Sequence, residues 1–280
     1  MSSLKCIMLL ALFTLTASQI PAVAAATDAR IDFASLDSSH QLKVYGTLYL
    51  PESASGRSPA VVMIHGTMGI DSRGTLYRVP LLNAGIAVFE VNFKDGIYKS
   101  PIDRPKIDTF LPLAFAALKE LRKVPSIDPA RIGIMGFSLG GAITLSTALD
   151  ENRKAWMGDE KGFAAHAGFY PVAKAFIPKI EGGSALTGAP IVIFYGTDDA
   201  YGDGDQVPEL KSLLQTKFNF ELTTYEYPGA THGFNLNAPP ITYFDPAAKH
   251  MRGHMAYDAQ ATEDSLPKLV DFMRKNLAVK

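Results

Sequence analysis

Short, continuously apolar runs alternate with segments of helical periodicity along most of this chain. Four runs are rich in β-branched residues and have the length of strands covered on both faces: Ala60–Ile64, Ile86–Val91, Arg131–Phe137 and Pro190–Tyr195. Gln41–Leu50 instead alternates polar and apolar residues, which is typical of a half-buried antiparallel strand. Weaker strand predictions are Phe163–His166 and Phe220–Tyr227.

Helical segments are predicted between these strands. They are Leu76–Asn83, Asp108–Lys123, Ala142–Leu149, Val207–Lys217 and Tyr257–Asn276. Such alternation favours an α/β fold with a mostly parallel, twisted sheet and helices on both faces. No internal repeat and no linker of biased composition divides the sequence, so a single domain is predicted. In folds of this class ligands bind beyond the carboxyl ends of the strands, which makes the loops at that edge the place to look for chemistry.

The first 26 residues have the pattern of an export signal rather than of a folded segment. Lys5 supplies a positive start, Cys6–Ala17 is an apolar run, and Ala22–Ala26 offers small-residue cleavage sites. We therefore expect residues 1–26 to be removed, residues 27–280 to form the α/β domain, and the protein to be exported to a periplasm or the medium. Cys6 is the only cysteine, so the mature chain is expected to have no disulfide, cysteine nucleophile or thiolate metal site.

The charge balance argues against one class of function. Lys and Arg number 27 and Asp and Glu 28, a net charge of −1, whereas nucleic-acid binders usually carry a basic excess. No apolar run reaches the roughly 18 residues of a membrane span. We expect a small-molecule substrate, no nucleic acid and no membrane span; oligomeric state is not indicated.

The segment Gly136-Phe137-Ser138-Leu139-Gly140 reads G-x-S-x-G and lies where a predicted strand meets a predicted helix. A nucleophile elbow needs this context, because a tight strand-to-helix turn lifts the serine hydroxyl clear of the sheet. Glycines are required where strand and helix approach closely. The pattern predicts Ser138 as a nucleophile; its structural alternative is a glycine-rich turn with a capping serine.

A serine hydroxyl needs a base, and the base in turn needs an acid. In this type of fold the chain order is serine, acid, histidine. His232 follows a strand candidate in a loop at the same sheet edge as Ser138, whereas His250 and His254 lie in a polar stretch. We expect His232 to be the base. For the acid, Asp199 is preferred over its neighbour Asp198, but the spacing of these residues leaves both open.

Two backbone N–H groups are expected to hold the oxyanion of the tetrahedral intermediate. One is that of Leu139, directly after the nucleophile, and the other lies in the loop His65-Gly66-Thr67-Met68-Gly69. Thr67 is the first choice and Met68 the second. His65 precedes the acid in the chain and is expected to be a structural hydrogen-bonding residue.

At this point the sequence resembles the dienelactone hydrolase family of α/β-hydrolases over roughly residues 40 to 277. The resemblance rests on the segments MIHGTMG, IDPARIGIMGFSLGG, AHAGFYP, IVIFYGTDD and YPGATHGF, in that order. It implies the α/β-hydrolase fold. The family's acid lies three residues after a glycine, which maps onto Gly196 and Asp199, and its base maps onto His232.

The sequence departs from the family at two points. True dienelactone hydrolases carry a cysteine nucleophile and are usually cytoplasmic, whereas here the residue is Ser138 and an export signal is predicted. The resemblance therefore implies a serine hydrolase of carboxylic esters, acting on a small-molecule ester or lactone with neither a metal nor an organic cofactor.

Substrate contacts are predicted from residues beside the catalytic loops. They are Met68, Tyr98, Tyr170, Tyr201 and Phe234, with Phe169 as a further aromatic candidate. Two other functions stay open. A peptidase or acyltransferase could use the same scaffold, and the acidic segment 198–205 could make the chain a non-catalytic calcium-binding protein.

Overall fold

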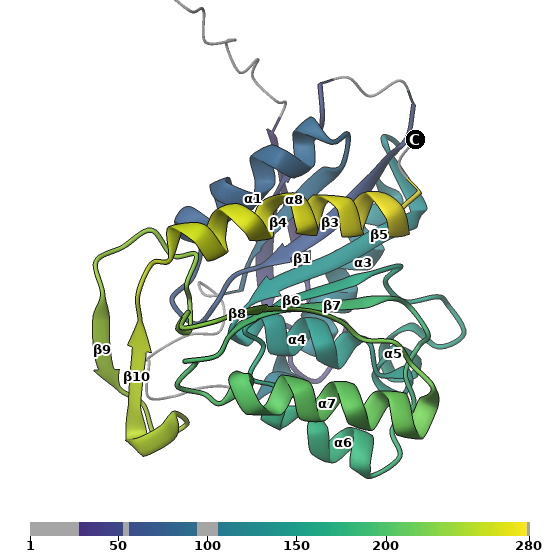
Figure 1. The fold of residues 1–280 in the computed structure, drawn as a ribbon. Coiled ribbons are helices and arrows are strands. Elements are labelled where there is room, and N and C mark those ends of the chain that lie inside the picture. Colours follow the sequence, from purple (N-terminus) through teal and green to yellow (C-terminus); the bar gives the residue numbers. More distant parts are fainter. Residues whose placement is uncertain (1–27, 53–55, 94–105, 279–280) are drawn as a thin grey trace, which may run out of the picture.

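The computed structural model describes residues 28–52, 56–93 and 106–278 and is built on an eight-stranded sheet (Figure 1). The strands stand in the order β1-β2-β4-β3-β5-β6-β7-β8. Their bounds are β1 Asp28–Ala34, β2 Lys43–Tyr49, β3 Ser58–Ile64, β4 Ala87–Asn92, β5 Ile127–Phe137, β6 His166–Phe169, β7 Ile191–Gly196 and β8 Thr223–Tyr227.

Strand direction follows the patterns seen in the sequence. The pairs β1–β2 and β2–β4 are antiparallel, and all pairs from β4 through β3 and β5 to β8 are parallel. Every residue of β3 is buried, whereas β2 alternates between buried and more exposed residues. Continuous burial is expected of a parallel strand covered on both faces. The predicted fold class, a mostly parallel sheet in a single α/β domain, is confirmed.

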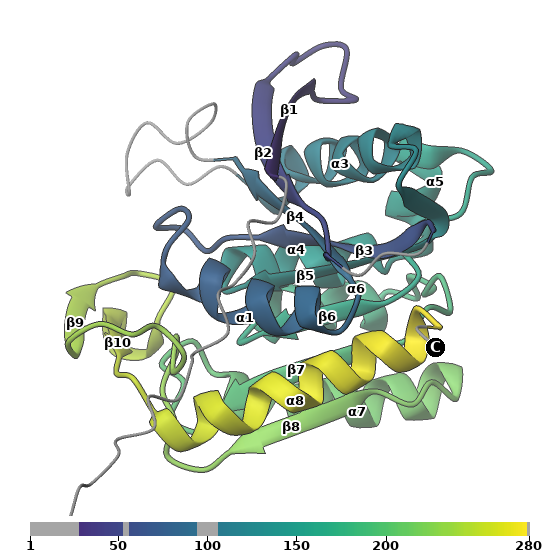
Figure 2. The same cartoon turned by 90° about the horizontal axis from the view of Figure 1, so that it is seen from above.

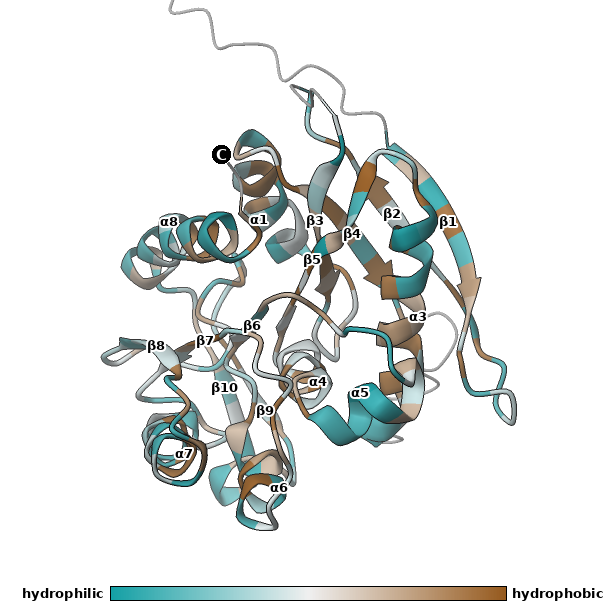
Figure 3. Ribbon diagram, turned by 90° about the vertical axis from the view of Figure 1, so that its right-hand side faces the viewer, coloured by the Kyte–Doolittle hydropathy of each residue, from teal (hydrophilic) through white to brown (hydrophobic). Residues whose placement is uncertain are grey.

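Helices cover both faces of this sheet (Figures 1 and 2). The helices α1 and α8 pack on one face, and α3, α4, α6 and α7 pack on the other. Figure 3 shows that α5 is largely hydrophilic, in keeping with its peripheral position. The bounds are α1 Ser72–Asn83, α3 Leu111–Lys123, α4 Leu139–Thr147, α5 Asp150–Met157, α6 Ile177–Glu181, α7 Asp203–Phe218 and α8 Ala259–Asn276. Short 3-10 turns are Ile107–Thr109, Ala173–Ala175 and Lys249–Met251.

The strand β3 shows how the core is divided. Val62 and Ile64 belong to the apolar cluster under α3, whereas Val61 and Met63 belong to the cluster under α1 and α8. Successive side chains of a strand point to opposite faces, so one apolar run supplies both clusters. The central strands are thereby held on both sides, and their carboxyl ends form a rigid edge.

Several elements differ from the sequence-based expectation. The predicted strand Phe163–His166 is instead β6, which begins at His166, and β8 begins at Thr223 rather than at Phe220. The elements β1, α5 and α6 were not predicted. Neither was a separate two-stranded sheet, β9 Ile241–Phe244 and β10 Arg252–Met255. None of the helices in the described ranges combines the length and the apolar composition needed to cross a bilayer.

Candidate active site

Ser138 lies at the corner between β5 and α4, with φ 54° and ψ −113°. A residue other than glycine seldom adopts such a backbone conformation, and it costs about 1–3 kcal/mol. The corner is possible because its neighbours are glycines. A Cβ at Gly136 would lie 2.2 Å from the Gly140 carbonyl oxygen, and one at Gly140 would lie 2.3 Å from the Ile64 carbonyl oxygen. Tight strand–helix contact thus forces the turn that presents the serine.

Ser138, His232 and Asp199 are brought together from three separate loops. The Nε2 atom of His232 is 2.8 Å from the Oγ of Ser138, and its Nδ1 is 2.8 Å from the Oδ2 of Asp199. The Asp199 carboxylate accepts the proton of Nδ1, which leaves Nε2 free to accept the hydroxyl proton of Ser138. The order and the distances of these three side chains are those that a nucleophile, a base and an orienting acid would need.

The two neighbouring aspartates have different surroundings. Asp199 is buried, and its second oxygen accepts the backbone N–H of Tyr201 at 2.7 Å. Asp198 is exposed, and its carboxylate accepts the hydroxyl of Thr197 at 3.2 Å. Only Asp199 therefore contacts the imidazole of His232.

Two aromatic rings pack against the imidazole of His232. The Tyr170 ring lies 4.7 Å from it, centroid to centroid, and the Tyr201 ring lies 4.4 Å from it. Contact with both rings limits rotation of the imidazole. Tyr170 itself has φ 38°, because the chain turns sharply after β6.

Asp203, at the start of α7, holds this turn after β6. Its carboxylate accepts the backbone N–H of Ala173 at 2.7 Å and that of Val172 at 2.9 Å. Val172 has a left-handed backbone with φ 55°. Burial, together with the nearby charge of Asp199, raises the pKa of Asp203 to about 7. No sequence signal separated this aspartate from its neighbours in the acidic loop.

The two proposed oxyanion donors come from the start of α4 and from the loop after β3. Leu139 is the first residue of α4, where backbone N–H groups have no helical acceptor, and Thr67 lines the cavity in front of Ser138. Within the ranges that the structure describes, no acceptor is found for either N–H. Met68 lines the same cavity and is half exposed.

His65 organises the loop that carries Thr67. Its Nε2 accepts the backbone N–H of Phe93 at 3.0 Å, so the proton is on Nδ1, which donates to the Gly66 carbonyl at 2.6 Å. A turn with the Gly69 N–H donating to Gly66 at 3.1 Å closes the loop. His65 thus makes the structural hydrogen bonds expected of it from its place in the chain.

Arg73 is a site residue that the sequence did not reveal. Its guanidinium lies in the wall of the cavity, is almost fully buried and forms a two-pronged ion pair with Asp71. A further N–H donates to the hydroxyl of Tyr170 at 3.0 Å. Asp71 is the N-cap residue of α1 and follows the loop that carries Thr67. Through its bonds to Asp71 and Tyr170, the Arg73 side chain therefore connects that loop to the turn after β6, whose Tyr170 packs on His232.

The Tyr170 hydroxyl continues a buried polar chain beyond Arg73. It donates to Asn235, whose side-chain amide donates to the hydroxyl of Tyr77 at 2.8 Å. Tyr77 in turn shares a 2.6 Å hydrogen bond with Ser265 of α8. Burial raises the pKa of Tyr170 to about 12, so its hydroxyl stays protonated. Four elements distant in sequence are fixed to one another by this chain.

A cavity of about 660 Å³ opens in front of Ser138 and His232. The segment that contains β9 and β10 supplies much of its wall, including Ile241, Tyr243, Phe244 and Met255. Of the predicted substrate contacts, Met68 and Tyr201 line the cavity. The structure does not bring the others there: Phe169, Tyr170 and Phe234 are fully buried behind it, and Tyr98 lies outside the described residues.

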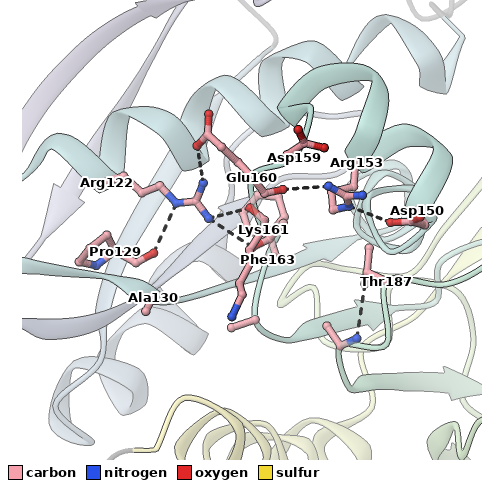
Figure 4. A pocket seen from close by; sticks show the side chains of 13 residues that line it. Arg122, Pro129, Ala130, Asp150, Arg153, Asp159, Glu160, Lys161, Phe163 and Thr187 are labelled. Atoms are coloured by element: carbon pink, nitrogen blue, oxygen red, sulfur yellow. Dashed lines mark hydrogen bonds and ion pairs between the residues drawn. The ribbon is translucent and has the colours of Figure 1, made fainter.

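A larger hollow, of about 800 Å³, lies at the opposite edge of the sheet, beside the start of β5 (Figure 4). Two arginines dominate it, and both are bound to the protein itself. Arg122 donates to the Pro129 carbonyl and to Glu160, and Arg153 donates to Asp150. The two arginines also donate to the backbone carbonyls of Gly158, Glu160 and Lys161, which holds the 158–164 loop in place. Ser138 is not among the residues that line this hollow.

The acidic segment 198–205 does not converge on one point. Asp199 binds His232, Asp203 binds backbone N–H groups, and Asp205 pairs with Lys249. In the part of the chain that the structure describes, no three His, Cys, Asp or Glu side chains are placed to hold a metal ion. The predicted alternative of a calcium site thus has no cluster of ligands in this segment.

Comparison with known proteins extends these observations. The family model described as "Dienelactone hydrolase family" matches residues 44–277. Two uncharacterized proteins of Mycobacterium tuberculosis, strains CDC 1551 / Oshkosh and ATCC 25618 / H37Rv, are each 27% identical over 163 residues, or 55% of this chain and 57% of theirs. The chain therefore matches little more than half the length of these relatives.

Solved structures share the fold at low identity. A dienelactone hydrolase-like promiscuous phosphotriesterase from metagenomic libraries has a TM-score of 0.64 and 19% identity, covering 90% of this chain and 99% of that one. A thermophilic esterase of the planctomycete Thermogutta terrifontis, with propionate bound, has a TM-score of 0.60 and 16% identity, covering 89% and 94%.

Proposed function

The chain belongs to the dienelactone hydrolase family, and from that premise we propose that it hydrolyses carboxylic esters of small molecules through Ser138, His232 and Asp199. The observation that carries the proposal is the unbroken hydrogen-bond chain from Asp199 through His232 to Ser138, with both distances at 2.8 Å. The strained backbone of the serine is a second, independent mark of a nucleophile.

In the first half of the reaction the Ser138 oxygen attacks the ester carbonyl carbon while Nε2 of His232 takes its proton. The negative oxygen that forms is held by the N–H groups of Leu139 and Thr67. As this intermediate collapses, the bond between the carbonyl carbon and the alcohol oxygen breaks. His232 returns its proton to that oxygen, and the alcohol leaves an acyl group on Ser138.

In the second half a water molecule repeats these steps. His232 takes a proton from the water, the hydroxide oxygen attacks the acyl carbon, and the proton passes to the Ser138 oxygen as the acid departs. Throughout, Asp199 keeps the proton on Nδ1 and stabilises the imidazolium. Arg73 and Asp203 act through their neighbours, by fixing the loops around the cavity.

A peptidase or an acyltransferase would use the same three side chains. Ester hydrolysis is preferred because proteins of similar fold include one described as a thermophilic esterase and one described as a dienelactone hydrolase-like promiscuous phosphotriesterase. Hydrolysis of p-nitrophenyl esters and of peptide p-nitroanilides, measured side by side, tests this choice. Faster cleavage of the anilides would favour a peptidase.

Replacing Ser138 tests the nucleophile directly. Ser138→Ala is expected to lower kcat for p-nitrophenyl acetate by about 10⁶, because a triad without its nucleophile retains only binding and oxyanion contacts. A fluorophosphonate should label the wild type once, on the peptide that contains Ser138, and should not label the variant. Unchanged hydrolysis in the variant would refute the assignment.

A further inference from the structure

The β9–β10 hairpin lies outside the main sheet, beyond the edge to which the parallel strands point (Figures 1 and 2). Its strands pair with each other, with Phe244 opposite Arg252 and Ile241 opposite Met255. Phe244 is 74% exposed and Ile241 is 47% exposed, although both line the cavity in front of Ser138. Exposed apolar side chains gathered at a cavity mouth are typical of a surface that binds something apolar.

The hairpin is attached on the histidine side of the cavity. Tyr201, whose ring packs on His232, bonds through its hydroxyl to Asp245 and, at 3.0 Å, to the hydroxyl of Tyr243. The hydroxyls of Tyr201 and Tyr243 and the carboxylate of Asp245 thus form hydrogen bonds within the wall of the cavity. What the hairpin offers to the cavity is mainly apolar surface, from Ile241, Phe244 and Met255, together with Pro246 and Ala247.

Further contacts join the hairpin to the loop that carries His232. The N–H of Ala256 donates to the hydroxyl of Thr231 at 2.9 Å. Met255 packs so closely on Gly233 that a Cβ there would lie 2.9 Å from its sulfur. The proposed oxyanion donors, Leu139 and Thr67, come from other segments. By attachment, the hairpin wall therefore belongs to the His232 side of the cavity, whereas the oxyanion donors belong to the side formed by the loop after β3 and the start of α4.

The proposed reaction places different parts of the ester on these two sides of the cavity. His232 must hand its proton to the alcohol oxygen as the ester bond breaks, so this oxygen has to lie next to Nε2 when the carbonyl oxygen is at the oxyanion donors. The alcohol arm then extends toward the histidine side. That side is where the hairpin is attached.

We infer that the β9–β10 hairpin holds the alcohol arm of the ester, and that this arm is an apolar chain or ring. The inference rests on the proposed function, since it uses the roles of Ser138 and His232. A cavity of about 660 Å³ is large enough for such an arm in addition to the reacting ester group.

The test varies one arm of the ester at a time. Ethyl, butyl, hexyl and octyl acetate differ only in the alcohol and form the same acetyl-enzyme. The p-nitrophenyl acetate, butyrate and hexanoate differ only in the acyl arm. For the alcohol series we expect kcat/KM to rise about two- to fourfold for each added methylene until the wall is covered.

The variants Phe244→Ala and Ile241→Ala test whether the hairpin is the surface that binds the alcohol arm. Both side chains are exposed, so the variants are expected to fold, and denaturation by urea checks this. Each should flatten the alcohol series. With the p-nitrophenyl esters, each variant should lower kcat/KM by the same factor for the acetate, the butyrate and the hexanoate, because the alcohol arm is the same in all three. The rate at which the acetyl-enzyme is hydrolysed should not change, because the alcohol has already left. Phe218→Ala, a partly exposed phenylalanine at the far end of α7, is the matched control and should change neither series.

Two results would overturn the inference. One is a flat alcohol series in the wild type, and the other is an effect of Phe244→Ala that grows with acyl length, which would assign the hairpin to the acyl arm. If no ester is cleaved and no fluorophosphonate labels Ser138, the proposed function itself fails. If a fluorophosphonate labels Ser138 and ethyl acetate is cleaved, but the longer alcohols are not preferred, the inference about the hairpin fails while the proposed function stands.

Discussion

Asp198 and Asp199 are adjacent in the chain, yet only one of them faces the imidazole. Asp199 is buried against His232 and Asp198 is exposed. The side chains of successive residues in a turn point in different directions. The carboxylate of Asp199 therefore lies in the site, while that of Asp198, one position earlier, lies in the solvent. The role of each aspartate can therefore be separated by paired substitutions.

Asp199→Asn is expected to lower kcat for p-nitrophenyl acetate by about 10⁴, because an amide no longer holds the productive tautomer of His232. Asp198→Asn is the matched control and should change kcat by less than about threefold. Steady-state kinetics of both variants measures this. A larger loss in Asp198→Asn would assign the acid to the other residue.

In Tyr170 the hydroxyl and the aromatic ring have separate roles. Tyr170→Phe keeps the ring against His232 but leaves Arg73 and Asn235 without their shared hydroxyl. Burying unpaired polar groups should lower the free energy of unfolding by about 1–3 kcal/mol. Urea denaturation measures it, with Tyr45→Phe as a control, since Tyr45 makes its bond to Asn92 at a partly exposed position. An equal loss in both variants would argue against the buried chain as a source of stability.

Among the elements, the contact of α4 with β3 determines where the serine is presented. Gly140 has no space for a side chain, because the Ile64 carbonyl oxygen would lie 2.3 Å from its Cβ. The helix can approach the strand only at a glycine. A methyl group there must push the helix, and Ser138 with it, away from the sheet.

Gly140→Ala is expected to lower the free energy of unfolding by about 1–3 kcal/mol through overpacking. It should also lower kcat by at least about 10², since a shift of roughly 1 Å misplaces Ser138, the proposed nucleophile. Gly182→Ala, at an exposed position with its nearest atom at 3.2 Å, is the control for a glycine-to-alanine change. Thermal melts and kinetics on both variants check this, and full activity in Gly140→Ala would contradict it.

For the whole molecule, a buried histidine links stability to pH. His166 is fully buried at the start of β6, and burial lowers its pKa to about 4 from a usual 6.5. Between these values the unfolded chain binds a proton that the folded chain does not. The contribution of His166 to the free energy of unfolding should therefore fall as the pH falls from about 6.5 to 4, by up to about 3 kcal/mol.

His166→Gln should weaken this pH dependence, whatever its effect on stability at neutral pH. The measurement is urea denaturation of the wild type and the variant at several values between pH 7.5 and 4.5. Parallel curves for wild type and His166→Gln would contradict the assignment to His166.

Export also concerns the whole chain, and it remains a prediction from sequence, because residues 1–26 lie outside the described part. We propose that cleavage follows Ala26. Expression in a bacterial host and amino-terminal sequencing of the exported protein should then find Thr27 as the first residue. A protein retained in the cytoplasm with its first residues intact would contradict this.

The sequence by itself determined the fold class and the corner that presents Ser138. Both depend on local patterns: continuous apolar runs mark covered strands, and G-x-S-x-G between strand and helix marks a turn that only glycines permit. The helix α5 and the strands of the β9–β10 hairpin were missed because they are only eight and four residues long, too short to establish a repeating apolar pattern.

Only the tertiary structure decided which side chains meet. That Asp199 rather than Asp198 contacts His232, that Arg73 reaches Tyr170 and that Phe244 lines the cavity are contacts between residues far apart in the chain. Such contacts depend on how whole loops pack at the edge of the sheet. No local pattern encodes that packing, because it results from the summed contacts of every element around the cavity.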